Sequence, residues 1–282
     1  MFNYIDIHSH LYFPDFDANR EEEIVKMKEN KIATITVGTD FDSSEKAIAL
    51  ADKHENLFAT VGIHPGDVTT ETDIGDISPK LEVLAENKKV VAIGECGLDY
   101  YRMSPDNTAL KDVQKKIFQI QIDLALKMDL PLMLHIRPQK ARLPLPEQSD
   151  GGQGTQDAYY DALEILEHFP RSDTSGKLRG NVHFFVGDLD VLKKFLALGF
   201  TVSFTGVITF ARDYDEIVRF APLDMIMSET DSPFVAPLPY RGKRNSPLYV
   251  SEVVKKIAEI RGEDLERVKI ALRDNALRYI AR

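Results

Sequence analysis

Two histidines near the start of the chain have the spacing of a metal-binding pair. The segment Ile5–His10 alternates apolar and polar residues, which predicts a strand with His8 and His10 on one face. Two imidazoles that point the same way can bind one metal ion. The pair is weak evidence by itself, because two ordinary polar histidines can have the same spacing.

Four later apolar segments also carry a histidine or a carboxylate at the predicted strand end. These residues are Glu95, His135, His183 and Asp231. In a parallel barrel the C-terminal strand ends surround one pocket, so we expect all four to converge there with His8 and His10. Six ligands exceed what one ion needs, and two ions bridged by a carboxylate suit the hydrolysis of phosphate esters. For any single member, the alternative is a buried polar residue held by hydrogen bonds.

Short apolar runs alternate with longer amphipathic stretches along the chain. They predict strands near residues 4–8, 32–38, 57–63, 90–94, 131–136, 180–185, 200–204 and 225–229. The helices predicted between them include Arg20–Asn30, Ser43–His54, Pro79–Asn87 and Leu110–Met128. This α/β pattern predicts a TIM-type (β/α)8 parallel barrel, with a doubly wound open sheet as the alternative. Because composition marks no boundary, we expect residues 1–282 to form a single domain.

Composition limits the compartment and the partners. With 35 Lys and Arg against 45 Asp and Glu, the net charge is −10, so a DNA substrate would require a local basic patch or metal ions. The single cysteine, Cys96, rules out an internal disulfide and fits a reducing, cytoplasmic location. The sequence shows neither a secretory signal nor an apolar run of about 18–20 residues. We therefore expect no membrane association, and no obligate protein partner is indicated.

The segment 138–157 interrupts the alternation of strands and helices. It holds three prolines and three glycines without apolar periodicity, which predicts a long loop. Because it follows a predicted strand, we expect this inserted loop on the catalytic face of the barrel. Two interpretations remain open, a disordered insertion and a lid that shapes the substrate site.

Six stretches of the sequence carry a resemblance to a known family. They are DIHSHL at 6–11, GIHP at 62–65, AIGECGLDYY at 92–101, LPLMLHIR at 130–137, ETDSPF at 229–234 and RGKRNSP at 241–247. Together they resemble the TatD family of metal-dependent deoxyribonucleases, which are amidohydrolase-like barrels. The resemblance spans nearly the whole chain. It implies two divalent ions as cofactors and the hydrolysis of phosphodiester bonds in DNA, commonly from a 3′ end.

The resemblance also implies roles for the candidate ligands. One ion would be held by His8, His10 and Asp231, the other by His135 and His183, and Glu95 would bridge both. The expected catalytic residues are Glu95 and Asp231, because Asp231 is placed to accept the proton of the attacking water as well as to bind an ion. The ions would be Mg, Mn or Zn: histidine ligands favour zinc or manganese, whereas the family resemblance points to magnesium.

Three further residues are candidates for substrate contacts or for supporting the ligands. His64 is expected to lie beyond the ligand shell or to contact phosphate, with direct coordination as the alternative. Arg137 would share the face of His135 and bind phosphate, or form a surface ion pair. Glu229 shares the face of Asp231 and would support the ligands.

A basic cluster lies in the last matching stretch. Its members are Arg241, Lys243 and Arg244. In an acidic protein these side chains would guide a phosphate backbone, and the alternative is a solvated charged loop. We include Arg241 and Arg244 among the candidate substrate contacts.

Two departures from the family pattern bear on the substrate. The long loop replaces the usual short passage after Arg137, and Phe184 follows His183 where a small residue is common. The principal hypothesis is a deoxyribonuclease of the 3′–5′ exonuclease type. One alternative keeps the metals but hydrolyses a small phosphoester, an amide or an aminoacyl-tRNA ester. The alternative from another class is a catalytically silent nucleic-acid-binding protein.

Overall fold

The computed structural model describes residues 2–104, 106–139, 155–169 and 178–281, and these residues form one sheet of eight parallel strands. The strands are β1 (Tyr4–Ser9), β2 (Ile32–Val37), β3 (Leu57–Val61), β4 (Val90–Asp99), β5 (Leu132–Arg137), β6 (Gly180–Val182), β7 (Thr201–Phe204) and β8 (Ile226–Ser228). Each strand pairs with the next along the chain, in the order β1 to β8. The predicted parallel barrel is confirmed. The doubly wound alternative is wrong, because its strand order would reverse at a switch point.

The barrel closes where the end of β1 meets the segment that follows β8. Ser9 and Ser232 form a parallel bridge between these segments. The His10 N–H donates to the Ser232 carbonyl at 2.8 Å, and the Asp231 N–H donates to the His8 carbonyl at 2.9 Å. Closure therefore places candidate ligands from the two ends of the sequence next to each other.

A buried carboxylate reinforces this closure. Asp6 accepts hydrogen bonds from the Thr230 N–H at 2.8 Å and from the Thr230 hydroxyl at 2.7 Å. It also accepts the His8 N–H at 3.2 Å and the Thr34 hydroxyl at 3.2 Å. Because a buried carboxylate must be satisfied by donors, these bonds tie β1, β2 and the segment after β8 into one arrangement.

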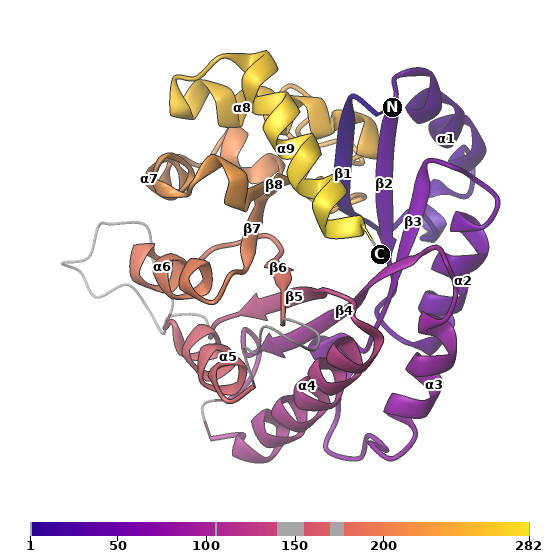
Figure 1. Ribbon diagram of the computed structural model, residues 1–282, viewed down its shortest axis with the longest axis vertical. Helices are drawn as coiled ribbons and strands as arrows, with labels where there is room; N and C mark the ends of the chain where they lie inside the picture. Colours follow the sequence, from indigo (N-terminus) through magenta and orange to yellow (C-terminus); the bar gives the residue numbers. More distant parts are fainter. Residues whose placement is uncertain (1, 105, 140–154, 170–177, 282) are drawn as a thin grey trace.

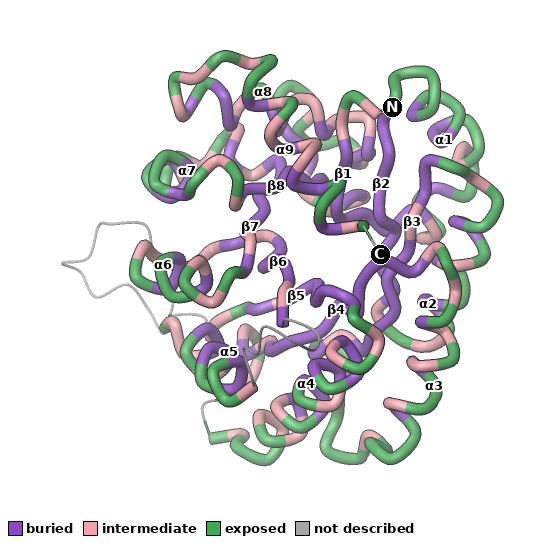
Figure 2. The backbone as a smooth tube through the Cα atoms, in the orientation of Figure 1, coloured by how far each residue is buried: buried purple, intermediate pink, exposed green. Residues whose placement is uncertain are grey.

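Helices follow the strands and surround the sheet (Figure 1). They are α1 (Arg20–Glu29), α2 (Phe41–Ala51), α3 (Ile77–Ala85), α4 (Thr108–Met128), α5 (Asp157–Glu167), α6 (Leu189–Ala197), α7 (Asp215–Phe220), α8 (Val250–Arg261) and α9 (Leu265–Ile280). The four helices specified from sequence are confirmed as α1 to α4, with ends shifted by up to three residues. Figure 2 shows buried strands inside helices whose faces alternate between buried and exposed, as expected for amphipathic helices around a barrel.

Helix α9 packs against the N-terminal ends of the strands. The Tyr279 hydroxyl donates to the Leu132 carbonyl at the start of β5 at 2.9 Å. The Asn275 side chain donates to the Ile226 carbonyl at the start of β8 at 2.7 Å. The candidate ligands lie toward the opposite, C-terminal ends, where parallel barrels hold their active sites. Within the described residues, we find no helix with the length and apolarity needed to cross a bilayer.

Strand β4 is longer than predicted, because it runs on from residue 94 to Asp99. Gly94 and Gly97 have φ values of +152° and +135°, and a Cβ atom at either would collide with the main chain of β5. Glycine at both positions therefore lets the bent strand stay paired with β5. As a result, Glu95 lies inside the strand, and Asp99 continues the face that carries it.

Strands β6 and β8 are shorter than predicted. His183 comes directly after β6, and Asp231 lies three residues beyond β8. Phe184 has a φ of +45° and Asp231 a φ of +53°. A left-handed residue turns the chain away from the extended path, so strand pairing stops close to these positions.

The inserted segment is only partly described. Residues 140–154 lie outside the described residues, so the choice between a lid and a disordered insertion stays a prediction. The two described ends contact each other: the Gln139 N–H donates to Asp157 Oδ1 at 3.1 Å, and the Thr155 hydroxyl donates to the same oxygen at 2.8 Å. These ends follow β5 and begin α5, on the side of the barrel that carries the candidate ligands.

Candidate metal centre

Glu95 lies at the centre of the site, where it is 3% exposed. Its Oε1 atom lies 2.8 Å from His135 Nδ1, 3.0 Å from His183 Nε2 and 3.5 Å from His64 Nε2. Its Oε2 atom lies 3.4 Å from His8 Nε2. The two oxygens of one carboxylate thus face different groups of imidazoles.

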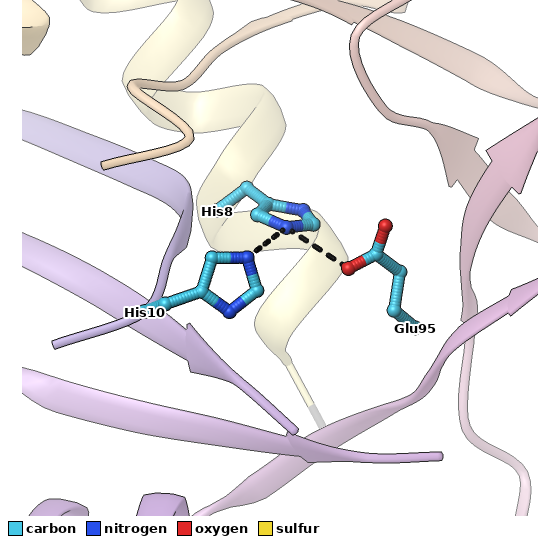
Figure 3. A group of neighbouring side chains, drawn as sticks. All are labelled: His8, His10 and Glu95. Atoms are coloured by element: carbon cyan, nitrogen blue, oxygen red, sulfur yellow. Dashed lines mark hydrogen bonds and ion pairs between the residues drawn. The ribbon is translucent and has the colours of Figure 1, made fainter. Parts of the chain in front are cut away.

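The group on the Oε2 side comprises His8, His10 and Asp231. The two Nε2 atoms of the histidines are 3.3 Å apart, and Figure 3 shows them turned toward each other beside Glu95. Asp231 Oδ1 lies 3.6 Å from His10 Nε2 and 3.8 Å from His8 Nε2. His10 Nδ1 lies 3.1 Å from the Val37 carbonyl, which can only accept, so Nδ1 carries the proton and Nε2 keeps its lone pair for the site.

The group on the Oε1 side comprises His135 and His183. His135 Nδ1 and His183 Nε2 are 3.3 Å apart. On its outer edge, His135 Nε2 lies 3.1 Å from Asp99 Oδ2, and His183 Nδ1 lies 3.5 Å from Glu229 Oε1. These outer carboxylates favour protons on the outer nitrogens, which leaves the inner nitrogens, beside Glu95, as the ring atoms that would bind a metal ion.

These residues fit divalent ions. Three groups of ligand atoms within 4.8 Å of one another occur among the described residues: His8, His10 and Glu95; His8, His183 and Glu229; and His64, Glu95 and His135. Two nitrogens that each lie about 2.1 Å from one tetrahedral ion are about 3.4 Å apart. Both inner pairs of ring nitrogens are separated by 3.3 Å. Imidazole and carboxylate ligands of this kind suit zinc, manganese and related divalent metals.

The carboxylates of the site are held in the ionised state. Burial raises the pKa of Glu95, but the surrounding imidazoles, His183 foremost, outweigh burial and hold that pKa well below its usual range. Burial likewise raises the pKa of Asp231, and the close contact with His10 together with the charges of His8 and His183 lowers it overall. Both side chains can therefore act as anionic ligands or proton acceptors near neutral pH.

His64 is oriented by its own turn. Its Nδ1 accepts a hydrogen bond from the Gly66 N–H at 2.9 Å, so the neutral ring carries its proton on Nε2. Burial lowers the pKa of His64 to about 4, which keeps the ring neutral near pH 7. In this tautomer the Nε2–H group is directed toward Glu95 as a donor, which favours a supporting role for His64 over direct coordination.

Asp99 is a site residue that sequence analysis missed. Its contact with His135 places it directly behind a candidate ligand, and the hydrogen bond from His135 lowers the pKa of Asp99 against the effect of burial. The signal was present, because residues 95, 97 and 99 share a face on a continuous strand. The predicted strand ended at residue 94 and so hid it.

Replacing Asp99 by asparagine is expected to reduce metal affinity by roughly 10- to 100-fold, because the His135 ring loses the carboxylate that fixes its tautomer. Metal titration by isothermal calorimetry would measure the change. The matched control is Asp190→Asn, because Asp190 forms an exposed ion pair with Lys193 on α6. This substitution should leave the metal affinity unchanged. Equal affinities in D99N and the wild type would contradict the orienting role of Asp99.

Two of the arginines that are candidate substrate contacts lie at the surface against aromatic rings. The guanidinium carbon of Arg137 is 3.7 Å from the ring centre of Tyr101. That of Arg241 is 4.0 Å from the ring centre of Phe210. Stacking of this kind restricts a long side chain while leaving the edge of the guanidinium able to donate hydrogen bonds.

Arg244 makes its contacts within the chain. It donates to the Asp15 carbonyl at 2.6 Å, to Asn19 Oδ1 at 2.8 Å and to Glu23 Oε1 at 2.8 Å. Its guanidinium carbon is also 4.3 Å from the ring centre of Phe16. These contacts join the segment after β8 to the start of α1, which gives Arg244 a structural task that the sequence did not reveal.

Removing the Arg244 side chain is therefore expected to destabilise the fold. Arg244→Ala should lower the free energy of unfolding by about 1–3 kcal/mol, because the poorly exposed Glu23 carboxylate loses its charged donor. Urea denaturation would measure the difference. Arg241→Ala, which removes an exposed guanidinium from the same loop, should change stability by less than about 0.5 kcal/mol. If R244A were as stable as the wild type but weaker in DNA binding, the predicted substrate role would be preferred.

The barrel and the converging histidines and carboxylates define a class, the metal-dependent hydrolases built on a (β/α)8 barrel. The family model described as TatD related DNase matches residues 5–281. The chain belongs to the TatD family of metal-dependent hydrolases.

Individual relatives agree with this assignment. An uncharacterized metal-dependent hydrolase of Bacillus subtilis, YabD, is 34% identical over 279 residues, which cover 97% of each chain. The 3′–5′ ssDNA/RNA exonuclease TatD of Cronobacter sakazakii is 31% identical over 283 residues, which cover 97% of this chain and 96% of that protein. The crystal structure of YjjV, a TatD homologue of Escherichia coli, has a TM-score of 0.80 and 25% identity, and the match covers 99% of this chain and 98% of that one.

Proposed function

We propose that this protein is a deoxyribonuclease that uses two divalent ions to hydrolyse phosphodiester bonds, removing nucleotides from a 3′ end. The observation that carries the proposal is the position of Glu95, whose two oxygens face different sets of ligand atoms. In this arrangement one ion would be held by His8, His10 and Asp231, the other by His135 and His183, and both by Glu95. The name of one relative, a 3′–5′ exonuclease of single-stranded DNA and RNA, supports the choice of substrate.

Four residues around the proposed metal ions have defined roles in this proposal. The ions, when bound, would polarise the scissile phosphoryl group and lower the pKa of the attacking water. Asp231, ionised near neutral pH, accepts the proton of that water. The His64 Nε2–H group donates to a phosphate oxygen or to Glu95. Asp99 and Glu229 hold the outer edges of two ligand rings and so maintain the geometry.

Exposed basic side chains would bring the DNA backbone to the site. The net charge of −10 makes long-range attraction of a polyanion unfavourable, so local cations must provide it. Arg137 and Arg241 are suited to this task because their guanidinium groups are exposed and stacked on aromatic rings. Lys243 lies in the same exposed loop as Arg241.

The proposal is tested with end-labelled single- and double-stranded DNA and protein first stripped of metal. We expect no cleavage without metal, and laddering from the 3′ end after addition of magnesium, manganese or zinc. Bound metal is counted in parallel by elemental analysis, with two ions expected for each chain.

Protein that binds two ions but cleaves no DNA would overturn the nuclease assignment. A panel of small phosphoesters, amides and aminoacyl-tRNA esters would then identify the bond that is hydrolysed. DNA binding that persists in chelator without any hydrolysis would instead indicate a binding protein.

A further inference from the structure

An exposed aromatic ring lies beside the candidate metal centre. Phe234 is 50% exposed although it is large and apolar. The Phe234 N–H donates to the Asp231 carbonyl at 2.9 Å, so a tight turn places this ring three residues after a candidate ligand. Exposure of a single apolar side chain is ordinary, so it is the position of this ring beside the candidate ligands that suggests contact with a ligand.

A second ring joins Phe234 to the histidines. Phe13 stacks on His10, with ring centres 4.8 Å apart and an interplanar angle of 23°. Phe13 and Phe234 meet edge to face, with centres 6.1 Å apart and an angle of 82°. The rings of Phe234 and His10 are themselves 6.3 Å apart. We call Phe13 and Phe234 the aromatic ledge.

The chemistry of the ledge defines its ligand. The metal centre attracts an anionic group. The ledge, whose Phe13 ring stacks on His10, favours a flat apolar group. A nucleotide combines the two, because one sugar joins its phosphate to an aromatic base. We propose that the aromatic ledge stacks a nucleobase next to the scissile phosphate, with Phe234 as the principal contact. This inference rests on the proposed nuclease function and adds to it a binding site for a base.

Stacking on a ring requires a π-face but no particular hydrogen-bonding edge, so all four bases should be accepted. An alanine substitution at a base-stacking aromatic typically loses about 5- to 150-fold in affinity. The ledge should therefore contribute to the binding of DNA without conferring a marked sequence preference.

The decisive test compares intact single-stranded oligonucleotides with oligonucleotides that carry an abasic residue on either side of the scissile phosphate. For the wild type, kcat/KM should fall by about 5- to 150-fold when the base is removed at one of these positions. In Phe234→Ala, intact and abasic substrates should be cleaved equally, at the wild-type rate for the abasic substrate. Phe234→Trp should keep the difference, because it keeps a stacking face.

Phe220→Ala is the matched control, because Phe220 is 48% exposed at the end of α7, where its ring centre lies 5.5 Å from Lys193 Nζ. It should behave as the wild type with every substrate. Equal slowing of intact and abasic cleavage by F234A would assign Phe234 a structural role and overturn the proposal. Wild-type protein that does not distinguish the substrates would overturn it as well.

A binding measurement separates failure of the ledge from failure of the nuclease function. Metal-loaded protein is titrated with deoxyadenosine 5′-monophosphate and, separately, with 2-deoxyribose 5-phosphate. Calorimetry measures the affinity for each compound. We expect the nucleotide to bind about 5- to 150-fold more tightly to the wild type, and both compounds to bind F234A equally. Protein that cleaves no DNA but shows this difference would retain the ledge and lose the nuclease assignment. Equal binding of both compounds to the wild type would reject the ledge.

Discussion

Glu95→Gln is expected to abolish hydrolysis and to leave fewer than two ions bound to each chain. The substitution keeps the size of the side chain but replaces one anionic oxygen by an amide nitrogen, which cannot be a ligand. Because the two oxygens face different imidazole groups, the charge that Glu95 supplies would be lost from both ion sites, and only the site with His8 and His10 would keep an anionic ligand, Asp231. Loss of several kcal/mol of charge stabilisation in the transition state corresponds to a fall in kcat of at least roughly 10³-fold.

The measurement combines kcat with the metal content of the purified, reloaded protein. Glu167→Gln, which changes an exposed glutamate on α5 in the same way, is the control and should match the wild type in both quantities. If E95Q retained turnover within about tenfold of the wild type, the bridging role of Glu95 would have to be abandoned.

The second large effect is expected for Asp231→Asn, which should lower kcat by roughly 10²- to 10⁴-fold. Asparagine tolerates the left-handed backbone at this position, where φ is +53°, so the fold should be preserved. The loss has two causes, because the amide can neither accept a proton from water nor serve as an anionic ligand. Asp231 Oδ1 lies within 3.8 Å of Nε2 of both His8 and His10.

Kinetics and metal titration together separate these two causes. A lower kcat with unchanged metal affinity would identify a proton acceptor alone, whereas the double role predicts that both decrease. Asp129→Asn is a close control, because Asp129 also has a left-handed backbone, with φ of +51°, but lies before β5 at the other end of the barrel. Activity of D231N equal to that of D129N would refute any catalytic role of Asp231.

Local patterns predicted the approximate positions of the strands and singled out the candidate ligands. Alternation within β1 placed His8 and His10 on one face, because successive side chains of a strand point to opposite sides. The same rule, applied to parallel strands that all lead toward one end of a barrel, brought Glu95, His135 and His183 together. The structure unites these residues through short contacts to Glu95.

Other features depend on contacts between segments far apart in the sequence. Asp99 reaches His135 because glycines at 94 and 97 let β4 bend and continue along β5. Closure of the barrel determines the partners of Asp6, and so the relation of His8 to the segment after β8. Alternation assigns a side chain to one face of a strand but does not specify how a strand bends or which segment lies opposite.

Charge and apolarity were equally ambiguous before the fold was known. Arg244 and Arg241 belong to one basic cluster in the sequence, yet Arg244 binds the start of α1 whereas Arg241 lies on the exposed ring of Phe210. Phe234 has the residue type of a core position but is half exposed beside the site. The sequence by itself determined the strands and the chemistry available to them. Only the tertiary structure decided which charged and aromatic side chains are used within the fold and which are exposed to a ligand, because burial and distance arise from packing.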